Sequence, residues 1–232
     1  MPGKFGDDYE YQRWFSNPIQ KAGYDLTKLA IVRHVIKNES LIPERILELG
    51  PGAGTWTKLL VHRFPDAYLD LIDISKEMLG RAQSALGENP HVRYVESDIL
   101  EWTPEGEYQY FFSSRVLEYI DDKKVFCEKI FSALSSGGGG FLITKMPHYE
   151  RERFLGRKTS ELHQGQIAPA ALRDALRASG FIDVDCYPVT MSIPLLNSPR
   201  LNFLMGKFFG RYTIDAFSMF FAESYCVVFR KP

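Results

Sequence analysis

The sequence predicts an α/β protein built on a doubly wound, mostly parallel, seven-stranded sheet with an N-terminal helical cap. Three observations carry this prediction. Apolar, strand-like runs lie between residues 45 and 231, and most of them alternate with segments of helical period. A glycine loop follows the first run directly. The length of 232 residues suits one such domain and is too short for two.

The expected elements follow one another in a regular order. Residues 1–40 form the cap, which ends in a helix with one apolar face between residues 26 and 36. The expected strands are 45–50, 67–75, 91–98, 108–114, 138–145, 182–193 and 223–231. The expected helices between them are 55–64, 75–86, 122–134 and 168–180. Ser75 could cap the second of these helices and Gly180 could end the fourth, while the glycines at 137–140 are expected to form a turn.

Composition narrows the class of protein. A hydrophobic content of 45% and a charged content of 25% are ordinary for a globular protein. The formal net charge of -1 provides no global basic field that would attract nucleic acid or anionic lipid. We therefore expect no nucleic-acid partner.

The cysteines and the apolar runs predict a cellular location. Cys127, Cys186 and Cys226 lie at wide, irregular spacings, which predicts reduced thiols and no metal site. The first residues include no apolar stretch of signal-peptide length, and no run of about 18 uncharged apolar residues occurs. We expect a cytoplasmic protein without stable membrane insertion.

The most informative segment is ILELGPGAGTWTKLL, residues 46–60. It has the pattern of a buried strand, a tight glycine loop at 50–54 and the first turn of a helix. Glycine lets a ligand approach bare backbone, and it tolerates positive φ without steric cost. A helix that opens near Thr55 also offers unpaired backbone N–H groups. The segment predicts a site for a nucleotide-like ligand.

Acidic residues after the next two strands refine this site. Asp73 ends the second strand, where a carboxylate can accept hydrogen bonds from both hydroxyls of a ribose. After the third strand, Glu96 or Asp98 could accept from an adenine amine, and the spacing favours Asp98. All of these residues lie at the carboxyl ends of expected parallel strands, where open α/β sheets bind ligands. Thr55 and Trp56 replace the last part of the dinucleotide fingerprint, which disfavours NAD(P).

These residues resemble the class I S-adenosylmethionine-dependent methyltransferases. Residues 48–54, ELGPGAG, match the family's first motif, [DE]-x-G-x-G-x-G, and Asp73 and Asp98 match its acidic positions after strands two and three. SSRVLEYI, residues 113–120, is similar to the fourth-strand segment of small-molecule members. The resemblance covers about residues 44–190, and it implies a Rossmann-like sheet with an antiparallel C-terminal hairpin.

The resemblance also implies which residues would bind S-adenosylmethionine. Glu48, Gly50 and Gly52 would line its methionine end, Asp73 would hold the ribose, Met78 would cover the adenine, and Asp98 and Ile99 would bind the adenine edge. Gly54, Ile74 and Ser114 complete the cofactor set, and Ser113, Ser114 and Arg115 would form the floor beneath the sulfonium and the acceptor. A positive sulfonium suits carboxylates and backbone dipoles better than a lysine clamp.

Under this resemblance the chain is a single domain, 1–232. It would consist of a cap or lid at 1–40, a cofactor-binding half at 41–146 and a substrate-side half at 147–232. The substrate-side half contains an apolar insertion at 191–221, which could be an acceptor wall, an oligomer face or, most commonly in such cases, core.

The candidates for catalysis are His148, His163 and Arg115. A histidine with a pKa near neutral can take the proton of an acceptor hydroxyl, although a lone histidine is more often structural. The basic stretch 146–158 suits a carboxylate or phosphate on the acceptor, and a solvated helix face is the commoner explanation of such a run.

Four aromatic residues of the cap have two possible roles. Tyr9, Tyr11, Trp14 and Phe15 could form a lid that excludes water from the sulfonium, or they could pin the cap to the sheet. The sequence alone does not choose between these roles.

The function implied is in-line methyl transfer to an O, N or C atom of a small-molecule acceptor, which could be apolar or anionic. Phe112 to Arg115 stand where amino-methylating nucleic-acid enzymes have [ND]-P-P-[YF], which disfavours that activity. Two alternatives stay open: a non-catalytic S-adenosylmethionine-binding module that acts through a protein partner, and an NAD(P)-dependent oxidoreductase. A homodimer is also compatible with the sequence.

Overall fold

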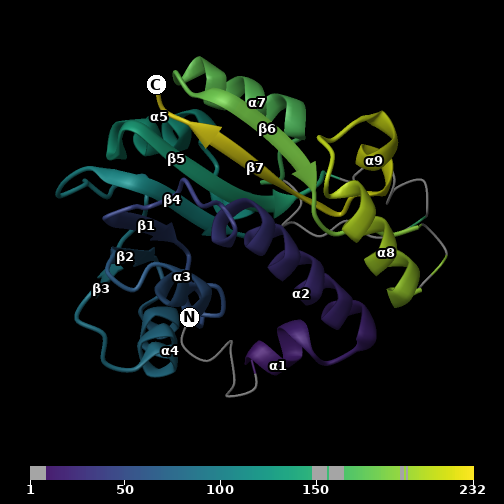
Figure 1. Cartoon of the computed structure of the whole chain (residues 1–232), viewed down its shortest axis with the longest axis horizontal. Coiled ribbons are helices and arrows are strands. Elements are labelled where there is room, and N and C mark those ends of the chain that lie inside the picture. Colours follow the sequence, from purple (N-terminus) through teal and green to yellow (C-terminus); the bar gives the residue numbers. More distant parts are fainter. Residues whose placement is uncertain (1–8, 148–155, 157–164, 194–195, 197) are drawn as a thin grey trace.

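The structure is a computed structural model that describes residues 9–147, 156, 165–193, 196 and 198–232. Its centre is one seven-stranded sheet in the order β3-β2-β1-β4-β5-β7-β6 (Figure 1). The strands are β1 (Arg45–Leu49), β2 (Tyr68–Asp73), β3 (Val92–Glu96), β4 (Tyr108–Ser114), β5 (Leu134–Lys145), β6 (Ile182–Pro188) and β7 (Ser224–Arg230). Strands β1 to β5 pair in parallel, and β7 pairs antiparallel with both β5 and β6. The expected mostly parallel sheet with an antiparallel C-terminal hairpin is confirmed.

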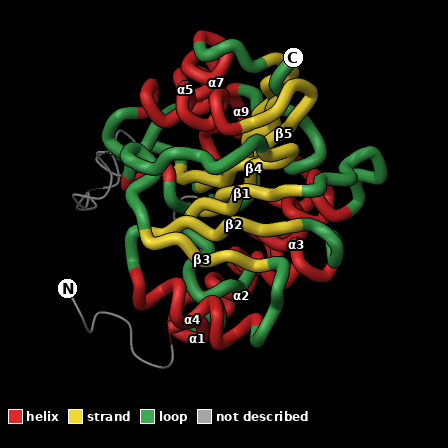
Figure 2. Tube along the Cα trace, turned by 90° about the vertical axis from the view of Figure 1, so that its left-hand side faces the viewer, coloured by secondary structure: helices red, strands yellow, loops and turns green. Residues whose placement is uncertain are grey.

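Helices cover both faces of this sheet, as Figure 2 shows from the side. They are α1 (Tyr9–Trp14), α2 (Pro18–Ile31), the π-helical turn η1 (Val32–Ile36), α3 (Thr57–Arg63), α4 (Lys76–Leu86), the 3-10 turn η2 (Leu117–Tyr119), α5 (Lys123–Ala133), α7 (Pro169–Ala178), α8 (Pro199–Phe209) and α9 (Ala216–Phe221). Side chains of a strand alternate between faces. Accordingly, Leu47 and Leu49 join a core with α5 and α7, while Ile46 joins a second core with α2, α3 and α4. Within the described residues, no helix is both long and apolar enough to cross a membrane.

The glycine run 137–140 lies inside β5, so the expected turn is wrong. β5 begins at Leu134, directly after α5. A Cβ on Gly140 would lie 2.2 Å from the ring of Phe229, and a Cβ on Gly138 would lie 2.8 Å from the carbonyl oxygen of Ser135. The glycines therefore allow close packing against neighbours, most of which are distant in sequence.

Aromatic rings hold the cap against the rest of the fold. The buried Trp14 ring lies edge-on to Tyr24 at 5.7 Å and to Trp56 at 5.5 Å between ring centroids. Tyr24 also stacks on Trp56 at 5.1 Å. These contacts join α1, α2 and the residue before α3. They agree with the role of Trp14 in which it pins the cap to the rest of the fold. Tyr11 and Phe15 stay partly exposed.

A buried carboxylate ties four neighbouring strands together. Asp70 of β2 accepts from Arg45 Nη2 of β1 at 3.0 Å and from Arg93 Nε and Nη2 of β3 at 2.8 and 2.9 Å. The hydroxyl of Tyr108 in β4 also donates to it. Burial alone would raise the pKa of Asp70, but the hydrogen bonds from Arg93 and Tyr108 outweigh it, and the pKa is lowered.

The three cysteines are free thiols in the core. Cys127 lies on α5, Cys186 on β6 and Cys226 on β7, and all three are buried. Burial raises the pKa of Cys127 to about 12 and that of Cys186 to about 11, and it also raises the pKa of Cys226. The reduced state expected from their spacing matches this arrangement.

Candidate functional site

A cavity of about 340 Å³ lies where the parallel strands end, and we call it the carboxyl-edge cavity. Segments that follow β1, β2, β3 and β4 line it, together with one residue of α1. The lining contains these sequence-predicted residues: Gly50, Gly52, Asp73, Ile74, Met78, Asp98, Ile99, Ser114 and Arg115. It also contains Arg13, Leu49, Ser97, Val116, Tyr119 and Ile120. Residues as far apart in sequence as Arg13 and Ile120 therefore share one cavity at the edge where α/β sheets bind ligands.

The glycine loop has the backbone conformation that requires glycine. Gly50, Gly52 and Gly54 have φ values of +68°, +57° and +79°. A Cβ on Gly50 would lie 2.1 Å from Cγ2 of Val116, so a side chain there would collide with the loop after β4. A Cβ on Gly52 would meet nothing within 4 Å, so the space over that backbone is open. A ligand in the cavity can therefore approach bare backbone at Gly52.

Two carboxylates line the cavity, Asp73 from the last position of β2 and Asp98 from the loop after β3. Asp73 Oδ1 accepts from the Ser75 backbone N–H at 2.9 Å, and Ser75 caps α4 as the sequence predicts. Burial raises the pKa of Asp73, and backbone hydrogen bonds at Ser75 and Gly52 oppose the rise. Asp98 Oδ1 accepts from the Leu100 N–H at 2.8 Å. Glu96, the alternative to Asp98, is exposed and does not line the cavity.

Glu48 and Gly54, by contrast, do not line the cavity. Glu48 is buried, and its Oε1 accepts from the Thr57 hydroxyl at 3.1 Å. Its Oε2 is buried without a partner among the described residues, and burial raises the pKa of Glu48 to about 8. Ser113 is also outside the lining, since its hydroxyl donates to the Leu49 carbonyl at 3.0 Å.

Arg115 occupies a constrained position at the end of β4. Its φ is +67°, and its backbone N–H donates to the Ile143 carbonyl at 2.8 Å. Its Nε donates to Glu118 at 3.1 Å, and Glu118 also accepts from the Thr144 hydroxyl at 3.0 Å. Burial lowers the pKa of Arg115 and Glu118 opposes the change. The guanidinium is thus held by a buried partner rather than free at the surface, as a plain surface charge would be.

A smaller cavity of about 180 Å³ adjoins the first and shares Arg13 and Arg115 with it, and we call it the adjoining cavity. Its other walls come from α1, α2, α8 and the segments that flank β6 and β7: Trp14, Ile19, Gln20, Ala22, Gly23, Leu26, Thr27, Thr190, Met191, Asn202 and Glu223. Asn202 Oδ1 is buried without a partner among the described residues. The adjoining cavity therefore offers mixed polar and apolar walls beside the ligand site.

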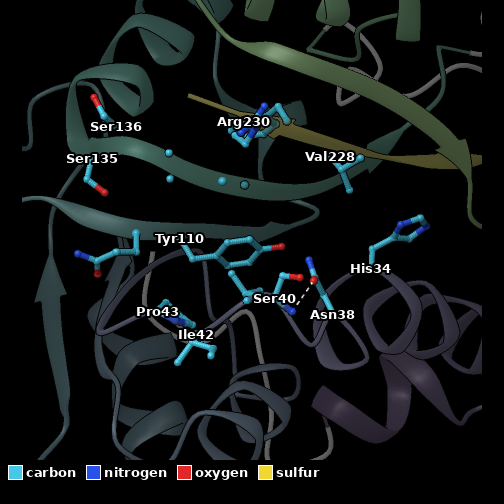
Figure 3. A pocket seen from close by; sticks show the side chains of 17 residues that line it. His34, Asn38, Ser40, Ile42, Pro43, Tyr110, Ser135, Ser136, Val228 and Arg230 are labelled. Atoms are coloured by element: carbon cyan, nitrogen blue, oxygen red, sulfur yellow. Dashed lines mark hydrogen bonds between the residues drawn. The ribbon is translucent and has the colours of Figure 1, made fainter. Parts of the chain in front are cut away.

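The cavity drawn in Figure 3 lies at the opposite, amino edge of the sheet. Its volume is about 560 Å³, and it is bounded by η1, the loop before β1 and the glycine run of β5. Tyr110 and His34 face this space in Figure 3, and burial lowers the pKa of His34 to about 4. None of the residues predicted to bind or react lines it.

The remaining sequence predictions have different outcomes. His148 and His163, with most of the basic stretch around His148, lie outside the described residues. Within the part of the chain that is described, no group of three or more His, Cys, Asp or Glu residues could hold a metal. Arg13 and Asn202 were missed, because only tertiary packing brings α1 and α8 beside the end of β4. Val116, Tyr119 and Ile120 were not named as site residues either, but they belong to SSRVLEYI, the segment that resembles the fourth-strand segment of small-molecule methyltransferases.

Known proteins share this fold and part of this sequence. Residues 46–138 match a family described as "Methyltransferase domain". A malonyl-[acyl-carrier protein] O-methyltransferase of Ilyobacter polytropus is 32% identical over 124 residues, which are 53% of this chain and 45% of that protein. A trans-aconitate 2-methyltransferase of Rhizobium meliloti is 33% identical over 125 residues, 53% of this chain and 46% of that protein. The aligned part of the chain thus spans less than half the length of these two relatives.

Solved structures with low sequence identity show the same fold. The Haemonchus contortus phosphoethanolamine N-methyltransferase 2 in complex with S-adenosyl-L-methionine matches with a TM-score of 0.66 and 15% identity, over 98% of this chain and 58% of that one. The N-methyltransferase NodS of Bradyrhizobium japonicum with S-adenosyl-L-homocysteine matches with a TM-score of 0.59 and 17% identity, over 95% and 91% of the chains.

Proposed function

Because this chain belongs, through residues 46–138, to the class I S-adenosylmethionine-dependent methyltransferase family, we propose that it methylates an O, N or C atom of a small-molecule acceptor. The observation that carries the proposal is the carboxyl-edge cavity, in which Asp73 and Asp98 lie beside the glycine loop. S-adenosylmethionine supplies an electrophilic methyl group on a positively charged sulfonium.

The residues of the cavity fit this cofactor. The open space over Gly52 would accept its methionine end, and the buried Oε2 of Glu48, close in sequence to that loop, is a hydrogen-bonding group without a partner among the described residues. Asp73 would accept from the ribose hydroxyls. Met78 and Ile99 are buried apolar side chains suited to the adenine ring. The lining includes no lysine, and its two cationic side chains are Arg13 and Arg115.

We place the acceptor in the adjoining cavity, because Arg13 and Arg115 wall both cavities. Two guanidinium groups suit an acceptor that carries a carboxylate, and Trp14 and Leu26 suit an apolar body. The relatives named for malonyl-[acyl-carrier protein] and trans-aconitate support an acidic acceptor. The side chains would hold the acceptor atom in line with the methyl group and keep water out, which is the main source of rate in such a transfer.

A general base is required only for some acceptors. A carboxylate is already ionised near neutral pH and needs no proton removed. His148 and His163 therefore remain candidate bases for a hydroxyl or amine acceptor only. The three buried thiols support a reducing, cytoplasmic location as part of this proposal.

The first test is calorimetric titration with S-adenosylhomocysteine. We expect micromolar binding by the native protein and at least a tenfold loss in Asp73→Ala. Asp66→Ala is the matched control, because Asp66 is an exposed aspartate just before the same strand. No binding by the native protein would overturn the proposal. Binding without turnover of any carboxylate, hydroxyl or amine acceptor would favour the non-catalytic module.

A further inference from the structure

The outer surface of α8 and α9 carries large apolar side chains in the open. Five side chains on these helices and on the turn between them make up what we call the aromatic face: Leu204, Phe208, Tyr212, Phe217 and Phe220, which are 60%, 54%, 57%, 55% and 57% exposed. A monomeric globular protein scatters such residues singly. Here they gather on the segment between β6 and β7, at one end of the molecule (Figure 1).

Ring contacts show that the face is continuous across both helices. Phe208 lies 5.7 Å from Tyr212 and 5.1 Å from Phe209 between ring centroids. Phe209 lies 5.3 Å from Phe217, which joins α8 to α9. Phe221 then contacts both Phe217 and Phe220 at 5.0 Å. The rings therefore form one surface instead of separate exposed residues.

The opposite side of α8 packs against the rest of the protein, so the helix cannot rotate to bury its outer side. A Cβ on Gly206 would lie 2.7 Å from Leu26 of α2, which shows how closely the two helices approach. Asn202 on the same side is buried. The outer side of α8 is thus held outward by packing.

Basic residues are interleaved with the aromatic face. Arg200, Lys207 and Arg211 are exposed. Arg200 and Lys207 lie on α8 at helical spacing from Leu204 and Phe208, and Arg211 follows the end of the helix. In the described ranges, the side chains of these three residues form no ion pair and no hydrogen bond. Asp215 is the one acidic residue between positions 188 and 222, and it caps α9 through Ser218. The local charge of this segment is therefore positive, although the whole chain carries -1.

We propose that the aromatic face of α8 and α9, with its three basic residues, binds the surface of an anionic lipid bilayer. Aromatic side chains beside Lys and Arg are the composition of helices that lie in a membrane interface. Anionic lipid headgroups complement the unpaired cations. The helices lie on the bilayer and do not cross it, since α8 has only 11 residues.

A second copy of the chain fits this face less well. A two-fold dimer places the same patch on both sides of the interface. Arg200, Lys207 and Arg211 would then face their own copies, with only the capping Asp215 to offset them. Charge complementarity therefore favours an anionic surface.

The test is flotation of the protein with two kinds of vesicle, one of phosphatidylcholine alone and one of phosphatidylcholine and phosphatidylglycerol in equal parts. We expect binding to the mixed vesicles and at least tenfold weaker binding to the neutral ones. Each basic residue near an anionic surface strengthens binding about fivefold. Lys207→Glu/Arg211→Glu should therefore lose at least tenfold, as should Phe208→Ser/Phe217→Ser.

Two matched variants serve as controls. Lys124→Glu reverses an exposed charge on α5, and Ile42→Ser removes an apolar side chain that is 83% exposed elsewhere. Both should bind as the native protein does, and equal thermal unfolding midpoints would show that every variant is folded. Absence of binding to mixed vesicles, or equal binding by all variants, would overturn the proposal. So would a dimer in sedimentation velocity that Phe208→Ser/Phe217→Ser dissociates, because the face would then belong to a second copy. Vesicle binding requires neither cofactor nor acceptor, so this result is separate from the methyltransferase test.

Discussion

At the residue scale, Glu48 makes stability depend on pH in an unusual direction. Its pKa is about 8 in the folded protein against an ordinary value of 4.5, so the native state holds the proton more tightly than the unfolded chain. The stability linked to this proton is complete below pH 4.5 and is lost as the pH rises towards 8. Glu48→Gln keeps the shape of the neutral acid and removes this loss.

We therefore expect Glu48→Gln to gain stability relative to the native protein by about 1.4 kcal/mol for each pH unit within that interval. Urea unfolding without ligand at both ends of the interval measures the difference. Glu44→Gln, an exposed glutamate before the same strand, should show no such trend. The same effect of Glu48→Gln at both pH values would contradict the assignment.

At the element scale, the docking of α8 on α2 depends on one glycine. Gly206→Ala would bring a methyl group to 2.7 Å from Leu26 and 2.9 Å from the Val189 carbonyl oxygen. Such overpacking costs about 1 to 3 kcal/mol, so the unfolding free energy should fall by that amount. Gly80→Ala in α4 is the control, since its Cβ meets nothing within 4 Å. It should raise stability by about 0.5 to 1 kcal/mol. Chemical denaturation of both variants measures their unfolding free energies. A change of the same sign in both variants would refute the packing argument.

Element boundaries also show what sequence can and cannot predict. β4 occupies residues 108–114 as expected, because an apolar run between polar turns is a local signal. Ser75 caps α4 for the same local reason. The strand expected at 138–145 lies within β5, but the turn expected at the glycine run 137–140 is wrong, because the packing of Phe229 against that run depends on a strand about ninety residues later. Arg13 and Asn202 reach the cavities only through helix packing, which leaves no motif in the sequence.

At the scale of the whole molecule, Asp70 of β2 is hydrogen-bonded to side chains of β1, β3 and β4, and so links four strands of the sheet. Its lowered pKa means that the ionised form stabilises the fold above pH 3.8 and that this contribution is lost as the pH falls through the folded-state pKa. Asp70→Asn should lower the unfolding free energy by about 2 kcal/mol at neutral pH. The difference from the native protein should shrink on acidification below pH 3.8. Urea unfolding at neutral pH and below pH 3.8, with Asp66→Asn as control, measures this difference. A difference in unfolding free energy between Asp70→Asn and the native protein that grows in acid would contradict the prediction.

The alkylation of the three buried thiols can also be used to measure local unfolding of the elements that carry them. Cys127, Cys186 and Cys226 lie on three different elements that pack in the interior. An alkylating reagent attacks the thiolate, which burial suppresses at all three positions. Each modified cysteine therefore records a moment at which its own element was exposed to solvent. Mass spectrometry of the labelled peptides can then order the loosening of α5, β6 and β7 in time, without any engineered probe.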